Sequence, residues 1–184
     1  MAVGIPREWM PLVRRVSLEK KEWVGVQLAD TAYFSAHLPP VATVASVGRA
    51  EEILDDISAQ VQRWKDTRLK APKWVVLGVD ANVRVPAEEE GRIGNVVWSR
   101  ELQSTLHRRQ TMALLTFASA HNLKLANTFD WSYEGCRSLG KRQARPQAWT
   151  WARYAHGQRD RESQLDYVLL PSGWESAGEV WRHR

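Results

Sequence analysis

The chain has 184 residues, which is the usual length of one domain. Hydrophobic residues make up 43% of it and charged residues 26%, a globular profile that excludes a disordered or membrane-spanning chain. A formal net charge of +5 favours polyanionic partners, nucleic acid above all, although a solvated basic surface would carry the same charge. The only cysteine, Cys136, leaves no partner for a disulfide and excludes a multi-cysteine zinc site.

The N-terminal segment gives an indication of where in the cell the protein is located. Residues 1–16 contain no apolar stretch of the kind found in signal peptides. No apolar run approaches the ~20 residues that a membrane-spanning helix needs. We therefore expect an intracellular protein that does not contact a membrane, with its compartment otherwise unknown.

Three strand candidates come first in chain order. Residues 12–19 alternate apolar and polar side chains, and residues 23–28 and 32–38 are two further candidates. Residues 29–31 are typical of a short turn, so we predict that the three strands form an antiparallel meander. Pro39-Pro40 then stops regular pairing, because proline has no backbone N–H.

The clearest helix in the sequence is predicted over residues 47–64. Four of its apolar side chains fall on one face, at spacings typical of a helix: Ile53, Ile57, Val61 and Trp64. Trp74–Val79 follows as an apolar run typical of a fully buried strand. Strand, helix and strand in this order predict a crossover connection between neighbouring strands of one sheet.

The second half of the chain is predicted to alternate loops with shorter elements. Residues 102–122 form the second helix, which Asn122 can end in a C-cap conformation. The other predicted segments are a mixed-charge loop over 83–95, a short strand over 123–128, a basic loop over 129–147, and two strands over 148–153 and 164–170 separated by a polar run over 155–163.

Polar side chains stand on or at the ends of several predicted strands. Asp80 and Asn82 follow a buried strand, which is where ligands of open α/β sheets gather. His37 and Thr150 belong to two other strand segments, and Asp166 stands in a mostly apolar one, where an unpaired carboxylate would cost several kcal/mol. Structural explanations exist as well, because Asp-x-Asn is common turn chemistry and a strand histidine often satisfies a backbone group.

Taken in order, these pieces resemble the endonuclease/exonuclease/phosphatase superfamily, the DNase I-like proteins. The matching pieces are His37-Leu38-Pro39, Asp80-Ala81-Asn82, the Leu-x-x-Ala-Asn-Thr-Phe segment over 123–129, Thr150-Trp151, and Leu165 to Leu169. They run from about Val24 to Leu170 and are most similar to retrotransposon-type endonuclease domains, which share the Asn-Thr-Phe and Thr-Trp pieces. The resemblance implies an α/β fold, a partial four-layered sandwich of two mixed β-sheets with flanking helices.

The resemblance also implies catalytic roles. Asp80 would orient the attacking water or help to bind the metal, and Asn82 would donate a hydrogen bond to the scissile phosphate. His37 lies where the family keeps a phosphate-contacting residue, and Asp166 matches the carboxylate that pairs with a catalytic histidine. The reaction would be hydrolysis of a phosphodiester in DNA or another nucleic acid, assisted by Mg²⁺ or Mn²⁺. The residues expected to bind the substrate are Thr150, Trp151 and Arg142.

The sequence departs from the family pattern at both ends. The principal metal ligand of the family is a glutamate in a Gln-x-Glu context, and Glu8, Glu19 and Glu22 all lack that context. The family ends in Ser-Asp-His, whereas Arg182 stands here in place of the aspartate, and we interpret His183 as a tail residue. We therefore expect a single domain over 1–184 that lacks the N-terminal strands and the C-terminal Ser-Asp-His strand of the family.

Three functions are compatible with this pattern. The first is a metal-dependent nuclease. The second is a catalytically inactive, retroelement-derived module that binds nucleic acid through its basic residues. The third is a phosphatase of small phosphoesters on the same scaffold. Charge does not separate them, since all three substrates are anionic.

Overall fold

The structure is a computed structural model that describes residues 4–18, 21–67, 70–85, 93, 104–128, 151–155, 158–163 and 165–174, with the backbone alone for 151–155 and 158–163. Its strands are β1 (Val13–Ser17), β2 (Trp23–Leu28), β3 (Thr31–His37), β4 (Trp74–Asp80), β5 (Leu123–Leu125), β6 (Trp151–Ala155), β7 (Gln158–Ser163) and β8 (Asp166–Pro171). Its helices are α1 (Val44–Asp66) and α2 (Thr105–Ala120), with 3₁₀ helices at Arg7–Leu12 and Ala126–Thr128. No helix in the described ranges has the length and apolarity needed to cross a membrane.

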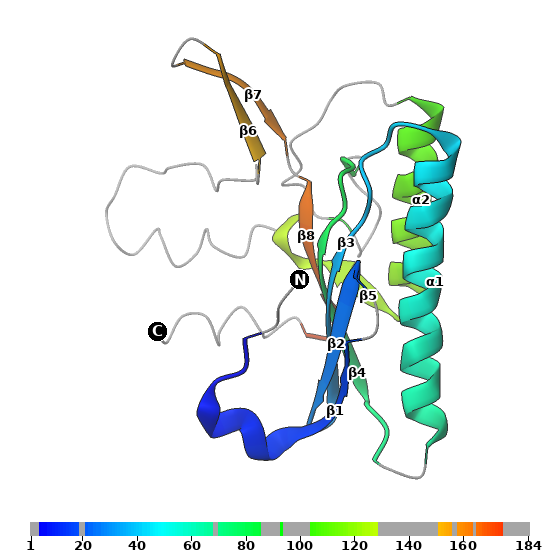
Figure 1. Cartoon of the computed structure of the whole chain (residues 1–184), viewed down its shortest axis with the longest axis vertical. Coiled ribbons are helices and arrows are strands. Elements are labelled where there is room, and N and C mark those ends of the chain that lie inside the picture. Colours follow the sequence, from blue (N-terminus) through cyan, green and yellow to red (C-terminus); the bar gives the residue numbers. More distant parts are fainter. Residues whose placement is uncertain are drawn as a thin grey trace.

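A six-stranded sheet in the order β1-β2-β3-β4-β8-β5 organises the described part of the chain (Figure 1). The first three strands form the predicted antiparallel meander. β3 and β4 then pair in parallel, joined through the predicted α1 crossover, and β8 runs antiparallel between β4 and β5. The α/β class is therefore confirmed, with parallel and antiparallel pairs in one mixed sheet.

Helices cover one face of this sheet. α1 and α2 pack against each other on the same side of the strands (Figure 1). Of the four layers that the family resemblance implies, the described residues show two, the helices and the six-stranded sheet. β6 and β7 form a separate two-stranded sheet, which is antiparallel where we expected a second mixed sheet, because so short a connection permits only a hairpin.

β7 corrects the prediction for the polar run over 155–163. We predicted that this run separates two strands, but Gln158–Ser163 is itself a strand and pairs with β6. Its sequence, Gln-Arg-Asp-Arg-Glu-Ser, has no apolar alternation, which is the signal that predicts a strand. Hairpin pairing depends on main-chain N–H and C=O groups, which polar residues supply as well as apolar ones do.

β4 is half-buried, where we predicted a fully buried strand. Val75, Leu77 and Val79 belong to the core that the helices cover, while Trp74 on the opposite face is 40% exposed. Burial alternates along the strand because described helices cover only one face of the sheet. The sequence did not reveal this alternation, because Trp74 and Val76, which lie on the opposite face, are apolar as well.

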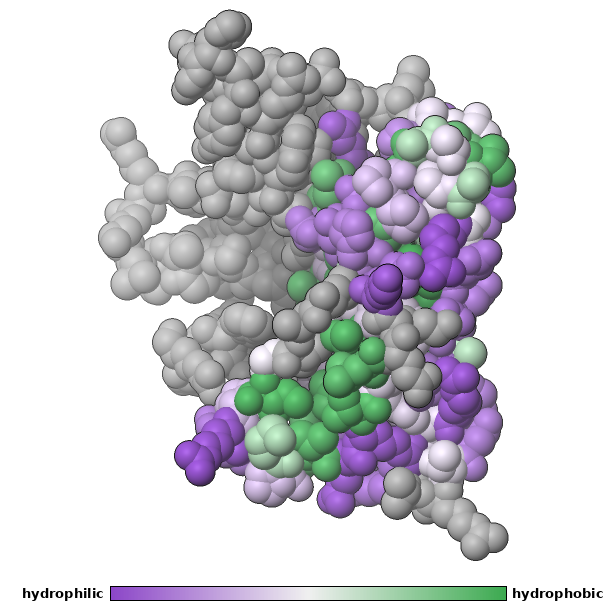
Figure 2. Space-filling view, in the orientation of Figure 1, coloured by the Kyte–Doolittle hydropathy of each residue, from purple (hydrophilic) through white to green (hydrophobic). Residues whose placement is uncertain are grey.

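Several large apolar side chains are exposed among the described residues. Figure 2 shows a hydrophobic patch on the lower part of the face drawn there. The exposed large apolar residues are Trp9, Met10, Leu12, Val16, Leu18, Val44, Trp74, Met112 and Val168. Several of them lie on or beside β1, one of the two edge strands of this sheet, so this edge is a part of the described surface that is open to association.

α1 begins earlier than predicted because a capping box extends it. Thr43 Oγ1 accepts a hydrogen bond from the Ser46 N–H at 3.1 Å, and Ser46 Oγ accepts one from the Thr43 N–H at 3.0 Å. The helix therefore starts at Val44 and not at Val47. The predicted apolar face is confirmed, since Ile53, Ile57, Val61 and Trp64 are all buried.

α2 confirms the second predicted helix within its described part. Ser104 caps it at the start, and Asn122 has a φ of 53°, the left-handed conformation that ends the helix as predicted. β5 is shorter than the predicted strand over 123–128, because the chain turns into a 3₁₀ helix at Ala126. The basic loop over 129–147 lies outside the described residues.

Gly25 lets three aromatic rings pack against β2. The Phe34 ring centroid lies 5.7 Å from that of Trp23 and 5.4 Å from that of Trp64. A β-carbon on Gly25 would lie 2.5 Å from Cε1 of Phe34 and 3.3 Å from the Trp64 ring. Because Phe34 is held between the two tryptophans, it has little freedom to move away. A β-carbon on Gly78, by contrast, would meet its nearest atom at 4.0 Å.

We predict that Gly25→Ala lowers the free energy of unfolding by about 1–3 kcal/mol, the usual effect of overpacking a core. Gly78→Ala is the matched control and should leave stability unchanged or slightly raised, since alanine restricts the unfolded chain. Urea unfolding followed by tryptophan fluorescence measures both variants. Equal stability of the two would contradict the aromatic packing described above.

Candidate active site

Three strand ends bring His37, Asp80 and Asp166 into one row. β3 and β4 are parallel and in register, so His37 lies opposite Asp80 where both strands end. β8 is antiparallel to β4 and begins at the same edge, which places Asp166 opposite Asp80 on the other side. The structure thus gathers three of the predicted catalytic residues where β3 and β4 end and β8 begins. Their catalytic roles stay predictions.

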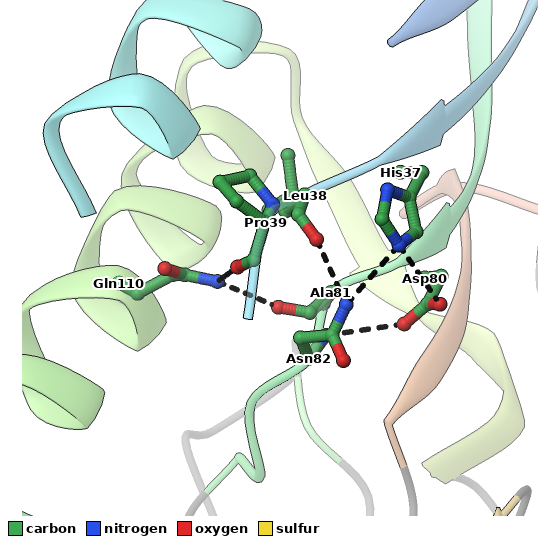
Figure 3. A network of polar contacts seen from close by, with 7 residues as sticks. All are labelled: His37, Leu38, Pro39, Asp80, Ala81, Asn82 and Gln110. Atoms are coloured by element: carbon green, nitrogen blue, oxygen red, sulfur yellow. Dashed lines mark hydrogen bonds and ion pairs between the residues drawn. The ribbon is translucent and has the colours of Figure 1, made fainter. Parts of the chain in front are cut away.

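The side chains of His37, Asp80 and Asn82 converge at this edge (Figure 3). His37 Nε2 lies 3.6 Å from Asp80 Oδ2, and the two side chains are 50% and 39% exposed. Asn82 Nδ2 lies 3.5 Å from the same His37 nitrogen and donates to the Leu38 carbonyl oxygen at 2.8 Å. A solvent-accessible carboxylate, imidazole and amide therefore lie within contact distance of one another.

Asn82 adopts a left-handed backbone conformation, with a φ of 49°. Asparagine tolerates this conformation better than most residues, which explains why the chain can turn sharply after β4. The backbone N–H of Asn82 also donates to Asp80 Oδ1 at 3.3 Å. Asp80-Ala81-Asn82 is therefore a turn as well as part of the candidate site. This turn directs the Asn82 amide toward His37.

The pKa of the Asp80 carboxyl is raised above its ordinary value. Partial burial is the main cause, and repulsion from the Asp166 carboxylate adds to it. The hydrogen bond from the Asn82 N–H and the attraction of His37 lower this pKa in part. Since the raising causes prevail, Asp80 takes up a proton more readily here than it would in water.

Tyr167 orders the segment that follows Asn82. Its hydroxyl is buried, donates to the Val83 carbonyl oxygen at 3.2 Å and accepts from the Val85 N–H at 3.1 Å. Burial raises the pKa of this hydroxyl, so it keeps its proton and both hydrogen bonds at neutral pH. We did not predict this role, although strand alternation after Asp166 indicates that Tyr167 faces the core.

Sequence reasoning also missed Gln110 of α2. This side chain is fully buried, and its Nε2 donates to the carbonyl oxygens of Pro39 at 3.1 Å and Ala81 at 2.9 Å (Figure 3). Its spacing of four residues before Leu114, on the apolar face of the helix, was the one available signal.

The side chains of the remaining predicted site residues lie outside the described part of the structure. Thr150 and Arg142 lie outside the described residues, as do Arg182 and His183. Trp151 begins β6, where only the backbone is described. Their proposed contacts with the substrate therefore stay predictions.

Glu22 lies beside the candidate site without joining it. Its carbonyl oxygen accepts from the His37 N–H at 2.9 Å, which continues the row of strand ends to the residue before β2. Its carboxylate instead forms an ion pair with Arg49 of α1 at 3.0 Å.

Asp80 and Asp166 are the carboxylates that could hold a divalent cation at this edge. Mg²⁺ commonly takes one or two protein carboxylates and completes its shell with water and substrate phosphates. Asp80 and Asp166 match this coordination preference, and the repulsion between their carboxylates favours a cation beside them. Within the described ranges, no group of three or more His, Cys, Asp or Glu residues is arranged to hold a metal ion.

Comparison with known proteins shows a remote structural likeness to a nuclease. No protein-family profile matches the sequence, and no curated protein matches it. Among solved structures, the chain is similar to a 3'-5' exonuclease (NExo) from Neisseria meningitidis, with 15% sequence identity and a TM-score of 0.47. The alignment covers 91% of this chain but 56% of that one, so the chain spans little more than half of the exonuclease.

We predict that Asp80→Asn stabilises the folded chain at pH 7. The raised pKa means that the folded state binds a proton more tightly than the unfolded state. Stability therefore falls as the pH rises from the ordinary value of 3.8 through the raised value, and it does not recover above it. Asparagine has no charge to dehydrate, so the gain should be present at pH 7 and absent at pH 3.

Urea unfolding at both pH values measures this effect. Asp66→Asn is the matched control, because Asp66 is an exposed carboxylate near the end of α1. A loss of stability for Asp80→Asn at pH 7 would contradict the dehydrated environment assigned to this carboxyl.

Proposed function

We propose that this chain is a phosphodiesterase of the endonuclease/exonuclease/phosphatase type, which hydrolyses nucleic-acid phosphodiester bonds with Mg²⁺ or Mn²⁺. The observation that carries the proposal is the row of His37, Asp80 and Asp166 on adjacent strand ends, with the Asn82 amide beside them. Carboxylates, an imidazole and an amide are the groups that water, a metal and a phosphate require. Within the family, the Asn-Thr-Phe and Thr-Trp pieces favour a retrotransposon-type endonuclease.

The proposed reaction is the attack of water on phosphorus. The new P–O bond forms as the bond to the leaving oxygen breaks, and a phosphate end and a hydroxyl end result. Asp80 would accept a hydrogen bond from the water and take its proton, a role that its raised pKa suits. Asp80 and Asp166 would hold a divalent cation, which would neutralise charge on the phosphate.

Asn82 and His37 would contact the phosphate. One Asn82 amide hydrogen is held by the Leu38 carbonyl oxygen at 2.8 Å. The other faces His37 Nε2 across 3.5 Å, a long contact that a phosphate oxygen can replace. His37 is half-exposed and donates as well when it is protonated. Both groups would stabilise the charge that builds on the phosphate oxygens.

A second candidate function is nucleic-acid binding without cleavage. The net charge of +5 favours it, because a basic protein attracts polyanions. In that case the basic residues would contact phosphates, and the affinity would fall steeply as salt rises.

We predict that the purified chain nicks supercoiled plasmid DNA in Mg²⁺ and stops when the metal is chelated. Asp80→Asn should lower the nicking rate roughly 100-fold or more, because it removes the proton acceptor. Asn82→Ala should lower it about 10²–10³-fold, the usual loss for one donor to a developing charge. Asp66→Asn removes a carboxylate elsewhere and should keep the wild-type rate.

The outcomes of these measurements distinguish the candidate functions. Equal nicking by the wild type and Asp80→Asn would exclude the proposed site. DNA binding that weakens with salt, without any cleavage, would support the second candidate. Hydrolysis of a soluble phosphomonoester without plasmid nicking would instead support a phosphatase of small phosphoesters.

A further inference from the structure

A buried amide links the two loops that carry the candidate site. Gln110 is 0% exposed, and its Nε2 donates both hydrogens, one to Pro39 and one to Ala81 (Figure 3). Pro39 follows His37 and Leu38 at the end of β3, whereas Ala81 lies between Asp80 and Asn82 at the end of β4. One side chain of α2 thus holds the backbone on both sides of the converging residues.

This donor acts where main-chain pairing between the two loops stops. The last main-chain hydrogen bond that joins them runs from the Leu38 N–H to the Asp80 carbonyl oxygen at 2.8 Å. Pro39 and Pro40 have no N–H with which β3 could continue the ladder. Beyond this point the carbonyl of Pro39 accepts from a side chain of another element, Gln110.

The amide orientation of Gln110 is fixed by its partners. Both partners are carbonyl oxygens, so the opposite orientation would place Oε1 against two acceptors. In the described residues Oε1 itself is buried without a hydrogen-bond partner. A buried unpaired acceptor is unfavourable, so the two donated hydrogen bonds are what this glutamine contributes.

We propose that Gln110 is a positioning residue of the candidate site. It fixes the backbone of Pro39 and Ala81 so that His37, Asp80 and Asn82 meet around one phosphate. This inference rests on the proposed phosphodiesterase function.

The chain contains a matched control for this proposal. Gln27 of β2 is also 0% exposed, its Nε2 donates to the carbonyl oxygens of Ala29 and Lys70 at 2.9 Å each, and its Oε1 also has no partner among the described residues. Lys70 precedes β4, so Gln27 lies at the opposite end of that strand from Asp80, roughly 20 Å away along the sheet. The two glutamines have the same chemistry, and only Gln110 contacts the loops of the site.

The test compares Gln110→Met with Gln27→Met. Each substitution removes two donated hydrogen bonds at nearly constant volume, so both should lower the unfolding temperature. Gln110→Met alone should lower kcat for plasmid nicking about 10–100-fold with KM little changed, the effect of misplacing reacting groups. It alone should also raise the amide exchange rates of Leu38 and Ala81 at least tenfold, relative to the rest of β3 and β4.

The outcomes separate this inference from the proposed function. If Gln110→Met and Gln27→Met lower kcat equally, or Gln110→Met keeps the wild-type kcat, the positioning role is overturned. If the wild type cleaves no phosphodiester, the proposed function fails, and local exchange at Leu38 and Ala81 still decides whether Gln110 holds the loops. If Gln110→Met does not fold, Gln110→Glu has the same size and keeps one donor as a buried neutral acid, so it should give intermediate values.

Discussion

The end of β3 determines the arrangement of the site, because the two prolines that follow it lack a backbone N–H. The Leu38 N–H makes the last main-chain bond there, to the carbonyl of Asp80. The carbonyls of Leu38 and Pro39 then accept from the side chains of Asn82 and Gln110. Two side-chain amides thus replace a backbone ladder, and the residues at the ends of β3 and β4 remain in register although the strands have stopped.

β8 completes the row by running against its neighbour. An antiparallel strand begins where β4 ends, so Asp166 joins His37 and Asp80 as the first residue of its strand. The next residue, Tyr167, faces the core and fixes the loop after Asn82 through its hydroxyl. Because side chains alternate along a strand, Asp166 lies on the face of the sheet opposite the helices, and Tyr167 lies on the face that the helices cover.

The sequence predicted those features that depend on local periodicity. The meander, the crossover helix, the buried stripe of α1 and the left-handed Asn122 all follow from patterns within a few residues. Gln110 could not be found in this way, because its partners are the carbonyls of Pro39 and Ala81, which only the fold brings to α2. The burial of β4 depends on which layers cover its two faces, and β7 pairs through main-chain groups that leave no side-chain pattern.

The two buried glutamines show why chemistry alone does not identify a site. Gln27 and Gln110 are equally buried, each donates to two carbonyl oxygens, and each has an Oε1 without a partner among the described residues. Gln27 links a turn to the segment that precedes β4, at the opposite end of that strand from Asp80, so its link serves the fold. Gln110 links the loops around Asp80, whose pKa is raised by burial and by Asp166. We infer that this burial serves the fold at one end of β4 and positions the candidate site at the other, because there it holds the loops of His37, Asp80 and Asn82 together.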